Sequence, residues 1–226
     1  RYSDSHGWLV RKESPKLMRT ILNPVDAPAH DAFVEKKSEF IGDAAHVDSL
    51  DEAIAFVGTI RDRHPKARHV AYAAVVGGSD GRVSERMSDD GEPSGTAGKP
   101  ILDVLRANGL TDCVVAVTRY FGGILLGSGG LIRAYSTGAS IAVKAAQGAD
   151  IVPCQRYLVT LEYPQLARFQ QLLAGVDGVQ SDETYAADIT LTATLPLGNA
   201  SSFEDRVRET FNATISPEPI DTVNRA

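Results

Sequence analysis

The chain has 226 residues, of which 43% are hydrophobic and 23% charged, an ordinary composition for a globular protein with room for two domains. Its formal net charge is −6, which excludes binding to nucleic acid through an overall positive charge. Any contact with nucleic acid would need a local basic patch. No apolar run approaches the roughly 20 residues that a membrane-spanning helix needs.

Two cysteines, Cys113 and Cys154, lie in apolar, strand-like contexts without the spacing of a zinc site. We therefore expect two buried free thiols in a reducing compartment. The first residues contain no apolar segment of the kind that a secretory signal requires. These features together predict a cytoplasmic protein.

The chain begins with a predicted tail, residues 1–28, which contains three prolines and no sustained periodicity. We expect residues 1–17 to add little to the fold, so that deleting them would leave the melting midpoint nearly unchanged. A pair of strands with a tight join near Lys37 and Ser38 is predicted over residues 32–44.

A helix is predicted next, because Ser49 and Glu52 have the spacing of a capping box. Apolar residues then recur at helical spacing until Pro65 ends the pattern. The segment from His69 to Val76 is mostly apolar and predicts a buried strand. Residues 82–87 are compatible with a further strand that leads into the first of two glycine-rich motifs.

The middle of the chain predicts a helix over residues 95–108, a short buried strand over 114–117 and a second helix over 131–146. We expect one domain over residues 29–149 and a second over 150–226. The second domain has the pattern strand, helix, strand, strand, helix, strand, with its last strand expected near residues 214–215. This order is typical of a ferredoxin-like fold.

The first motif, residues 88–100, contains three carboxylates within four residues: Asp89, Asp90 and Glu92. They are candidate catalytic groups or ligands of a hard cation, together with His69. The alternative is a polar turn whose side chains cap the following helix, with His69 as a hydrogen-bonded structural residue. The spacing around Lys99 does not match a P-loop, so we expect no nucleotide cofactor.

The second motif, residues 118–135, surrounds two arginines with five glycines and does not match a dinucleotide-binding fingerprint. Arg119 and Arg133 could face one cavity and bind an anion, or they could pair with the carboxylates of the first motif. Tyr120 and Phe121 suit stacking or a protein contact, although core packing is the commoner use. The predicted binding residues are Ser94, Gly95, Thr96, Lys99, Arg119, Tyr120, Phe121, Gly122, Gly123, Gly127, Gly129, Gly130 and Arg133.

The strings SDDGEPSGTAGKPIL, VTRYFGGILLGSGGLIRAY and HPKARHVAYA resemble the IMPACT/YigZ family, in the same order and spacing. The resemblance covers residues 33–146 strongly. It implies an α+β protein: an N-terminal α/β sandwich like domain two of ribosomal protein five, followed by a ferredoxin-like βαββαβ domain. It also implies a link to translation, because the eukaryotic relatives are regulators of translation that compete for the activator of a stress kinase.

Three functions remain open on the sequence. The first is a cytosolic regulatory protein whose partner is the ribosome, RNA or a translation factor, with no cofactor, no metal and no membrane. The second is a hydrolytic enzyme that uses Asp89, Asp90 and Glu92. The third is a protein-interaction module without an anion site. The first two depend on whether the two motifs meet in space and leave charged side chains accessible.

Overall fold

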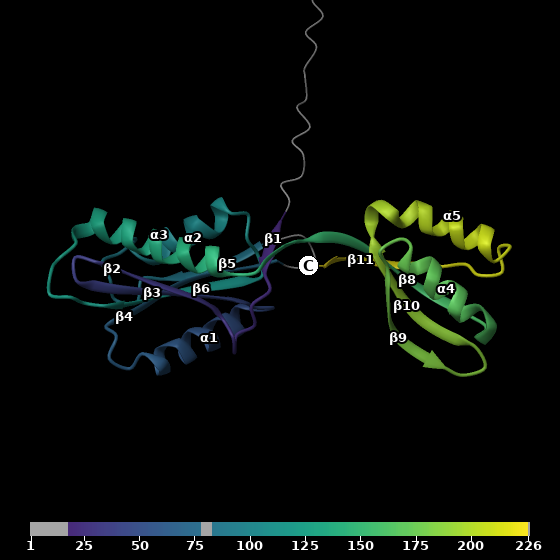
Figure 1. Ribbon diagram of the computed structural model, residues 1–226, viewed down its shortest axis with the longest axis horizontal. Helices are drawn as coiled ribbons and strands as arrows, with labels where there is room; N and C mark the ends of the chain where they lie inside the picture. Colours follow the sequence, from purple (N-terminus) through teal and green to yellow (C-terminus); the bar gives the residue numbers. More distant parts are fainter. Residues whose placement is uncertain (1–17, 78–82, 226) are drawn as a thin grey trace, which may run out of the picture.

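The computed structural model describes residues 18–77 and 83–225, so the prediction for residues 1–17 lies outside the described residues. The chain has a mixed α/β, two-domain architecture, as expected (Figure 1). Each domain contains its own sheet and its own apolar core. The division at residue 149 stays a prediction.

The N-terminal domain is built on a five-stranded antiparallel sheet with the order β2-β3-β6-β4-β5. Its strands are β2 (Ala29–Glu35), β3 (Ser38–His46), β4 (His69–Gly77), β5 (Val83–Ser88) and β6 (Cys113–Tyr120). The central strand β6 is buried along almost its whole length. Apolar side chains therefore cover both faces of the sheet.

Three helices cover these two faces: α1 (Leu50–Arg63) on one side, and α2 (Gly98–Ala107) and α3 (Gly127–Ala145) on the other (Figure 1). Phe56 and Ile60 of α1 belong to one buried cluster. Tyr135 of α3 and Leu105 of α2 belong to the other. The sheet is thus the middle layer of three.

The tight join between β2 and β3 is confirmed and lies at Lys36 and Lys37, both with positive φ. Positive φ at both central residues is the geometry of a two-residue hairpin turn. The capping box is confirmed in part. Ser49 Oγ accepts from the Glu52 N–H, but the Glu52 carboxylate accepts from the N–H of Asp48, one residue earlier than the pattern predicts.

Two helix starts differ from the prediction. Helix α2 begins at Gly98, three residues late, because the N–H groups of Gly95 and Ala97 donate to the side chain of Asp89. Helix α3 begins at Gly127, four residues early, because Gly129 and Gly130 belong to the helix rather than to the loop. Gly127 itself has a positive φ of 71° where the loop enters the helix. Strand β6 also extends to Tyr120, so Arg119 lies within the sheet.

The C-terminal domain has the ferredoxin-like order, with antiparallel strands β11-β8-β10-β9 and two helices on one face (Figure 1). Its elements are β8 (Val152–Leu161), α4 (Leu166–Ala174), β9 (Val179–Tyr185), β10 (Ile189–Pro196), α5 (Ala200–Thr210) and β11 (Glu218–Arg225), with short 3-10 turns at Tyr163–Gln165 and Leu197–Asn199. The last strand was expected at residues 214–215, which is wrong: Ile215 is buried but irregular, and the strand follows it.

A small two-stranded ribbon joins the N-terminal segment to the connection between the domains. Strand β1 (Arg19–Ile21) pairs antiparallel with β7 (Gly148–Asp150), and Ile21 is buried. The described part of the predicted tail, residues 18–28, is therefore ordered. Both cysteines are buried and free, as expected. Within the described residues, no helix is long and apolar enough to cross a membrane.

Candidate functional site

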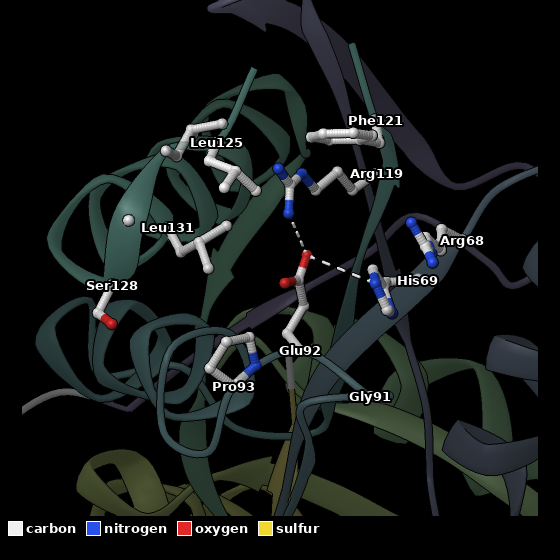
Figure 2. Close-up of a pocket in the computed structure, with 12 residues that line it drawn as sticks. Arg68, His69, Gly91, Glu92, Pro93, Arg119, Phe121, Leu125, Ser128 and Leu131 are labelled. Carbon is white, nitrogen blue, oxygen red and sulfur yellow. Dashed lines mark hydrogen bonds and ion pairs between the residues drawn. The ribbon is translucent and has the colours of Figure 1, made fainter. Parts of the chain in front are cut away.

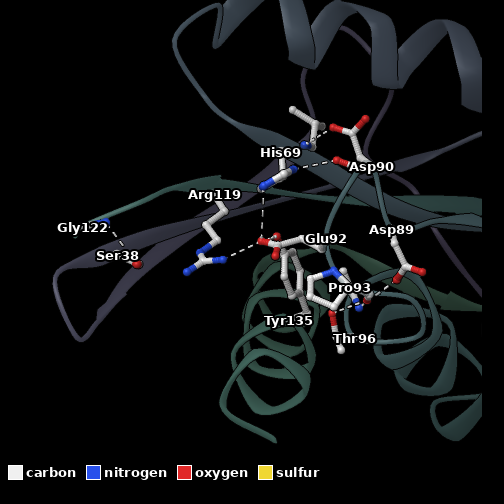
Figure 3. A network of polar contacts seen from close by, with 12 residues as sticks. Ser38, His69, Asp89, Asp90, Glu92, Pro93, Thr96, Arg119, Gly122 and Tyr135 are labelled. Atoms are coloured by element: carbon white, nitrogen blue, oxygen red, sulfur yellow. Dashed lines mark hydrogen bonds and ion pairs between the residues drawn. The ribbon is translucent and has the colours of Figure 1, made fainter. Parts of the chain in front are cut away.

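The two glycine-rich motifs meet at one end of the N-terminal sheet, as the sequence suggested. Glu92 of the first motif accepts from two donors at one oxygen: Arg119 Nη1 at 2.7 Å and the Tyr135 hydroxyl at 2.8 Å (Figure 3). The side chains of Arg119 and Glu92 are 7% and 4% exposed. The pair is therefore a buried, hydrogen-bonded ion pair that joins β6, α3 and the loop before α2.

Tyr135 shares this burial. Desolvation and the neighbouring Glu92 carboxylate both raise the pKa of the Tyr135 hydroxyl above its ordinary value, so it stays a donor at physiological pH. Sequence reasoning did not identify Tyr135 as a residue of the site. Leu131 and Tyr135 are four residues apart, which places both side chains on one face of α3. This spacing was the available signal in the sequence.

Asp89 caps the start of α2. Its carboxylate accepts from the backbone N–H groups of Gly95, Ala97 and Gly98 at 2.8–3.0 Å. Burial opposes ionisation of Asp89, but the three N–H groups outweigh burial and lower its pKa below the usual 3.8. Thr96 donates its hydroxyl to Pro93 and completes the turn. The capping interpretation of the motif describes Asp89 well.

Asp90 fixes the motif to the sheet on the other side. Its carboxylate accepts from the N–H of Val70 at 2.6 Å and from Arg61 at 2.8 Å. Its carbonyl oxygen lies 2.7 Å from His69 Nδ1, so Nδ1 carries a proton and donates, and Nε2 faces Glu92 at 4.0 Å. The three carboxylates thus have three separate sets of partners. Within residues 18–77 and 83–225, no three His, Cys, Asp or Glu side chains are grouped to hold a metal ion.

A cavity of about 540 Å³ opens beside the buried pair (Figure 2). Its wall contains the charged or polar residues Arg68, His69, Glu92, Arg119 and Ser128, with Gly91 and Gly127, and the apolar residues Pro93, Phe121, Leu125, Leu126 and Leu131. Figure 2 shows the Arg119 guanidinium between Phe121 and Leu125, with Glu92 and His69 opposite. This volume is typical of small-ligand pockets.

The two arginines of the second motif do not share this cavity. Arg133 is exposed and lines a neighbouring cavity of about 240 Å³ with Phe33, Glu35 and Lys36. Leu126 lies between the two cavities and lines both. Because α3 begins four residues earlier than predicted, Arg133 lies in its second turn rather than its first.

The other predicted binding residues divide into those near the cavity and those away from it. Phe121 and Gly127 line it. Lys99 is exposed and pairs with Asp103 along α2. Tyr120 bonds to His64 at 3.0 Å. The remaining predicted residues form the loops or the start of α3: Ser94, Gly95, Thr96, Gly122, Gly123, Gly129 and Gly130.

Sequence reasoning named Phe121 as a binding residue but missed the two large apolar residues that follow it in the loop near the cavity mouth. Phe121, Ile124 and Leu125, here named the apolar rim, are 42%, 41% and 82% exposed in the loop between β6 and α3. Arg68, on the opposite side of the mouth, is also exposed. Three large apolar residues in a glycine-rich loop, where polar residues are usual, were the available signal.

Replacing Asp89 by Asn is expected to lower the free energy of unfolding by about 2 kcal/mol at pH 7, because the amide accepts less well from three N–H groups. The folded-state pKa of Asp89 is lowered, so its stabilisation is present above about pH 4 and is lost as the pH falls through the folded pKa. Urea unfolding between pH 7 and pH 2.5 should show the difference between wild type and variant shrinking below pH 4. Asp62→Asn, exposed on α1, is the control; a difference that stays constant with pH would contradict the capping role.

Comparisons with known proteins agree with this architecture. A family model described as the Impact N-terminal domain matches residues 36–143, and one described as a domain of unknown function matches residues 159–214. The IMPACT family member YigZ of Escherichia coli (strain K12) is 40% identical over 174 residues, covering 77% of this chain and 85% of the relative.

Two solved structures are also similar. A crystal structure of a hypothetical protein is 35% identical, with a TM-score of 0.63 over 90% of this chain and 97% of that one. The two-domain translational regulator Yih1 is 26% identical over 53% of this chain and 47% of its own, with a TM-score of only 0.36. At this coverage, the match to the first structure spans most of both domains.

Proposed function

The chain belongs to the IMPACT family, and from that membership we propose that it is a cytosolic binding protein in the regulation of translation. The apolar rim and the cavity behind it form the contact surface in this proposal. The partner is a protein of the translation apparatus. The family resemblance supports the link to translation, and the geometry of the cavity mouth supports binding.

The observation that carries the proposal is the exposure of the apolar rim beside charged side chains. Aromatic and aliphatic groups that surround a partly charged pocket are typical of protein contacts, in which a few anchors contribute most of the affinity. The net charge of −6 disfavours bare RNA. A protein partner therefore fits this surface better than an RNA backbone does.

The hydrolytic alternative finds less support in the geometry. A pair of carboxylates that shares a water molecule or a metal ion must face a common space. Asp89 and Asp90 instead accept from backbone N–H groups on opposite sides of the motif, and Glu92 accepts from Arg119 and Tyr135. Each carboxylate has a structural role that explains its presence.

The test is the binding of purified protein to ribosomes by co-sedimentation, and to purified initiation, elongation and release factors by pull-down. We expect Leu125→Glu to lower the bound fraction at least about tenfold, because it places a charge at the most exposed apolar position of the rim. Met87→Glu is the matched control, since Met87 is 50% exposed on β5 and does not line the cavity.

Two results would contradict the proposal. In the first, wild-type protein binds none of the components at low salt. In the second, Leu125→Glu and Met87→Glu bind as wild type does. Charge reversal at Arg119 is not a clean test, because it would also break the buried pair with Glu92.

A further inference from the structure

We infer that the 540 Å³ cavity binds a single carboxylate carried on an apolar group. The inference deepens the proposed function and rests on it in one respect: the same cavity mouth contacts the partner. It adds the chemistry that the partner presents there. The argument depends on one buried arginine, on the charge balance of the wall and on the apolar remainder of that wall.

The first observation is an unused edge of the Arg119 guanidinium. Glu92 takes Nη1, while Nε is buried and has no hydrogen-bond partner among the described residues. A buried donor without an acceptor is costly and rare in native proteins. The Nε side of a guanidinium presents two parallel N–H groups, Nε and one Nη, which a carboxylate accepts in bidentate form. Because Nε has almost no solvent-accessible surface, the Arg119 side chain must turn before a carboxylate in the cavity reaches both donors. The Cζ atom of Arg119 lies 5.5 Å from the ring centroids of Phe40 and Phe121.

The second observation is the charge of the wall. Arg68 and Arg119 face a single carboxylate, Glu92, so the cavity carries one surplus positive charge when His69 is neutral. The N-terminus of α3 adds to it, because Gly127 and Ser128 line the cavity and no side chain of residues 18–77 or 83–225 caps the helix at Leu126. One surplus charge matches a monoanion better than the dianion of a phosphate monoester.

The third observation is the apolar part of the wall, formed by Pro93, Phe121, Leu125, Leu126 and Leu131. A bare inorganic anion would leave these surfaces in water. An apolar body beside the carboxylate would cover them and gain the corresponding transfer free energy. The wall therefore fits a hydrophobic carboxylate, either a free organic acid or the C-terminal carboxylate of a peptide that ends in an apolar residue.

The experiment is a titration of the methyl-labelled full chain followed by NMR, with 3-phenylpropionate as the probe and 3-phenylpropionamide as its neutral counterpart. We expect the methyl signals of Leu125, Leu126 and Leu131 to shift with the acid at a Kd of about 1 mM or tighter. The amide should bind at least about tenfold more weakly, since it lacks the charge. A tripeptide that ends in Leu-Phe, with a free or an amidated C-terminus, separates the peptide source from the free acid.

The variants are Arg68→Ala and Arg119→Lys. Arg68 is exposed, so we expect the fold of Arg68→Ala to be intact. Its Kd for 3-phenylpropionate should rise about fivefold or more. Arg119→Lys keeps a charge beside Glu92 but removes the bidentate edge, and its spectrum shows whether the fold is preserved. Arg63→Ala, an exposed arginine of α1 outside the cavity, is the control.

Four results would overturn the inference: no probe shifts these methyl groups, the amide binds as well as the acid, inorganic phosphate binds more tightly than the acid, or Arg68→Ala binds as Arg63→Ala does. These outcomes are separate from the proposed function. If Leu125→Glu abolishes binding to a translation component while 3-phenylpropionate does not bind, the carboxylate site is wrong and the proposed function stands. If 3-phenylpropionate binds but the chain binds no translation component, the carboxylate site stands and the proposed function is wrong.

Discussion

Replacing Arg119 by Ala is expected to lower the free energy of unfolding of the N-terminal domain by about 3–5 kcal/mol. The substitution leaves the Glu92 carboxylate 4% exposed, with the Tyr135 hydroxyl at 2.8 Å and the His69 ring at 4.0 Å. An uncompensated buried charge costs far more than the pair contributes, because the desolvation of the remaining ion is no longer offset. Urea unfolding followed by far-UV circular dichroism measures the change.

Two further variants separate the buried charge from lost packing. The double variant Arg119→Met with Glu92→Gln removes both charges and should recover most of the loss. Lys99→Ala breaks an exposed pair on α2, in which the two side chains are 59% and 48% exposed, and should cost less than about 0.5 kcal/mol. If Arg119→Ala costs no more than Lys99→Ala, the pair does not hold the two motifs together.

Replacing Gly42 by Ala is the second large effect, at about 3 kcal/mol or more. An added Cβ would lie 2.3 Å from the carbonyl oxygen of Gly138 and 3.0 Å from the Cβ of Ala142. Both contacts belong to the middle of α3, and one of them is backbone, so the whole helix would have to move away from β3. The same urea titration applies.

Gly58→Ala is the matched control, because a Cβ at this position in α1 meets nothing within 4 Å. Here the substitution removes only the entropic cost of a helical glycine and should stabilise the chain by about 0.5–1 kcal/mol. Opposite signs for the two glycines are therefore expected. Equal effects would show that α3 does not approach β3 as closely as described.

The elements could be predicted from the sequence where a local pattern determines them. The period of apolar residues marks α1 and the strand that starts at His69, and the order of segments marks the ferredoxin-like domain. The start of α3 could not be found this way. Its first four residues include three glycines, which have low helix propensity, and the first of them, Gly127, has a positive φ of 71°.

The site was predictable only in its location. Two polar, glycine-rich motifs indicate that the two loops meet, but their spacing does not decide which carboxylate pairs with which arginine. Arg119 bonds to Glu92, 27 residues away, while Asp89 bonds to backbone N–H groups and Asp90 to a backbone N–H and to Arg61. A shift of four residues in the start of α3 then places Arg133 in a different cavity from Arg119. Long-range pairing of this kind depends on the assembled sheet rather than on any window of sequence.

The position of β8 determines how this protein can be divided into autonomous pieces. Strand β8 spans Val152–Leu161 and has β10 on one side and β11 on the other. A fragment cut at the limits of the C-terminal family match, residues 159–214, would discard most of that central strand and the whole of β11. Two rows of hydrogen bonds would lose their partner at once. A self-sufficient excised module must therefore start no later than Val152 and continue to Arg225.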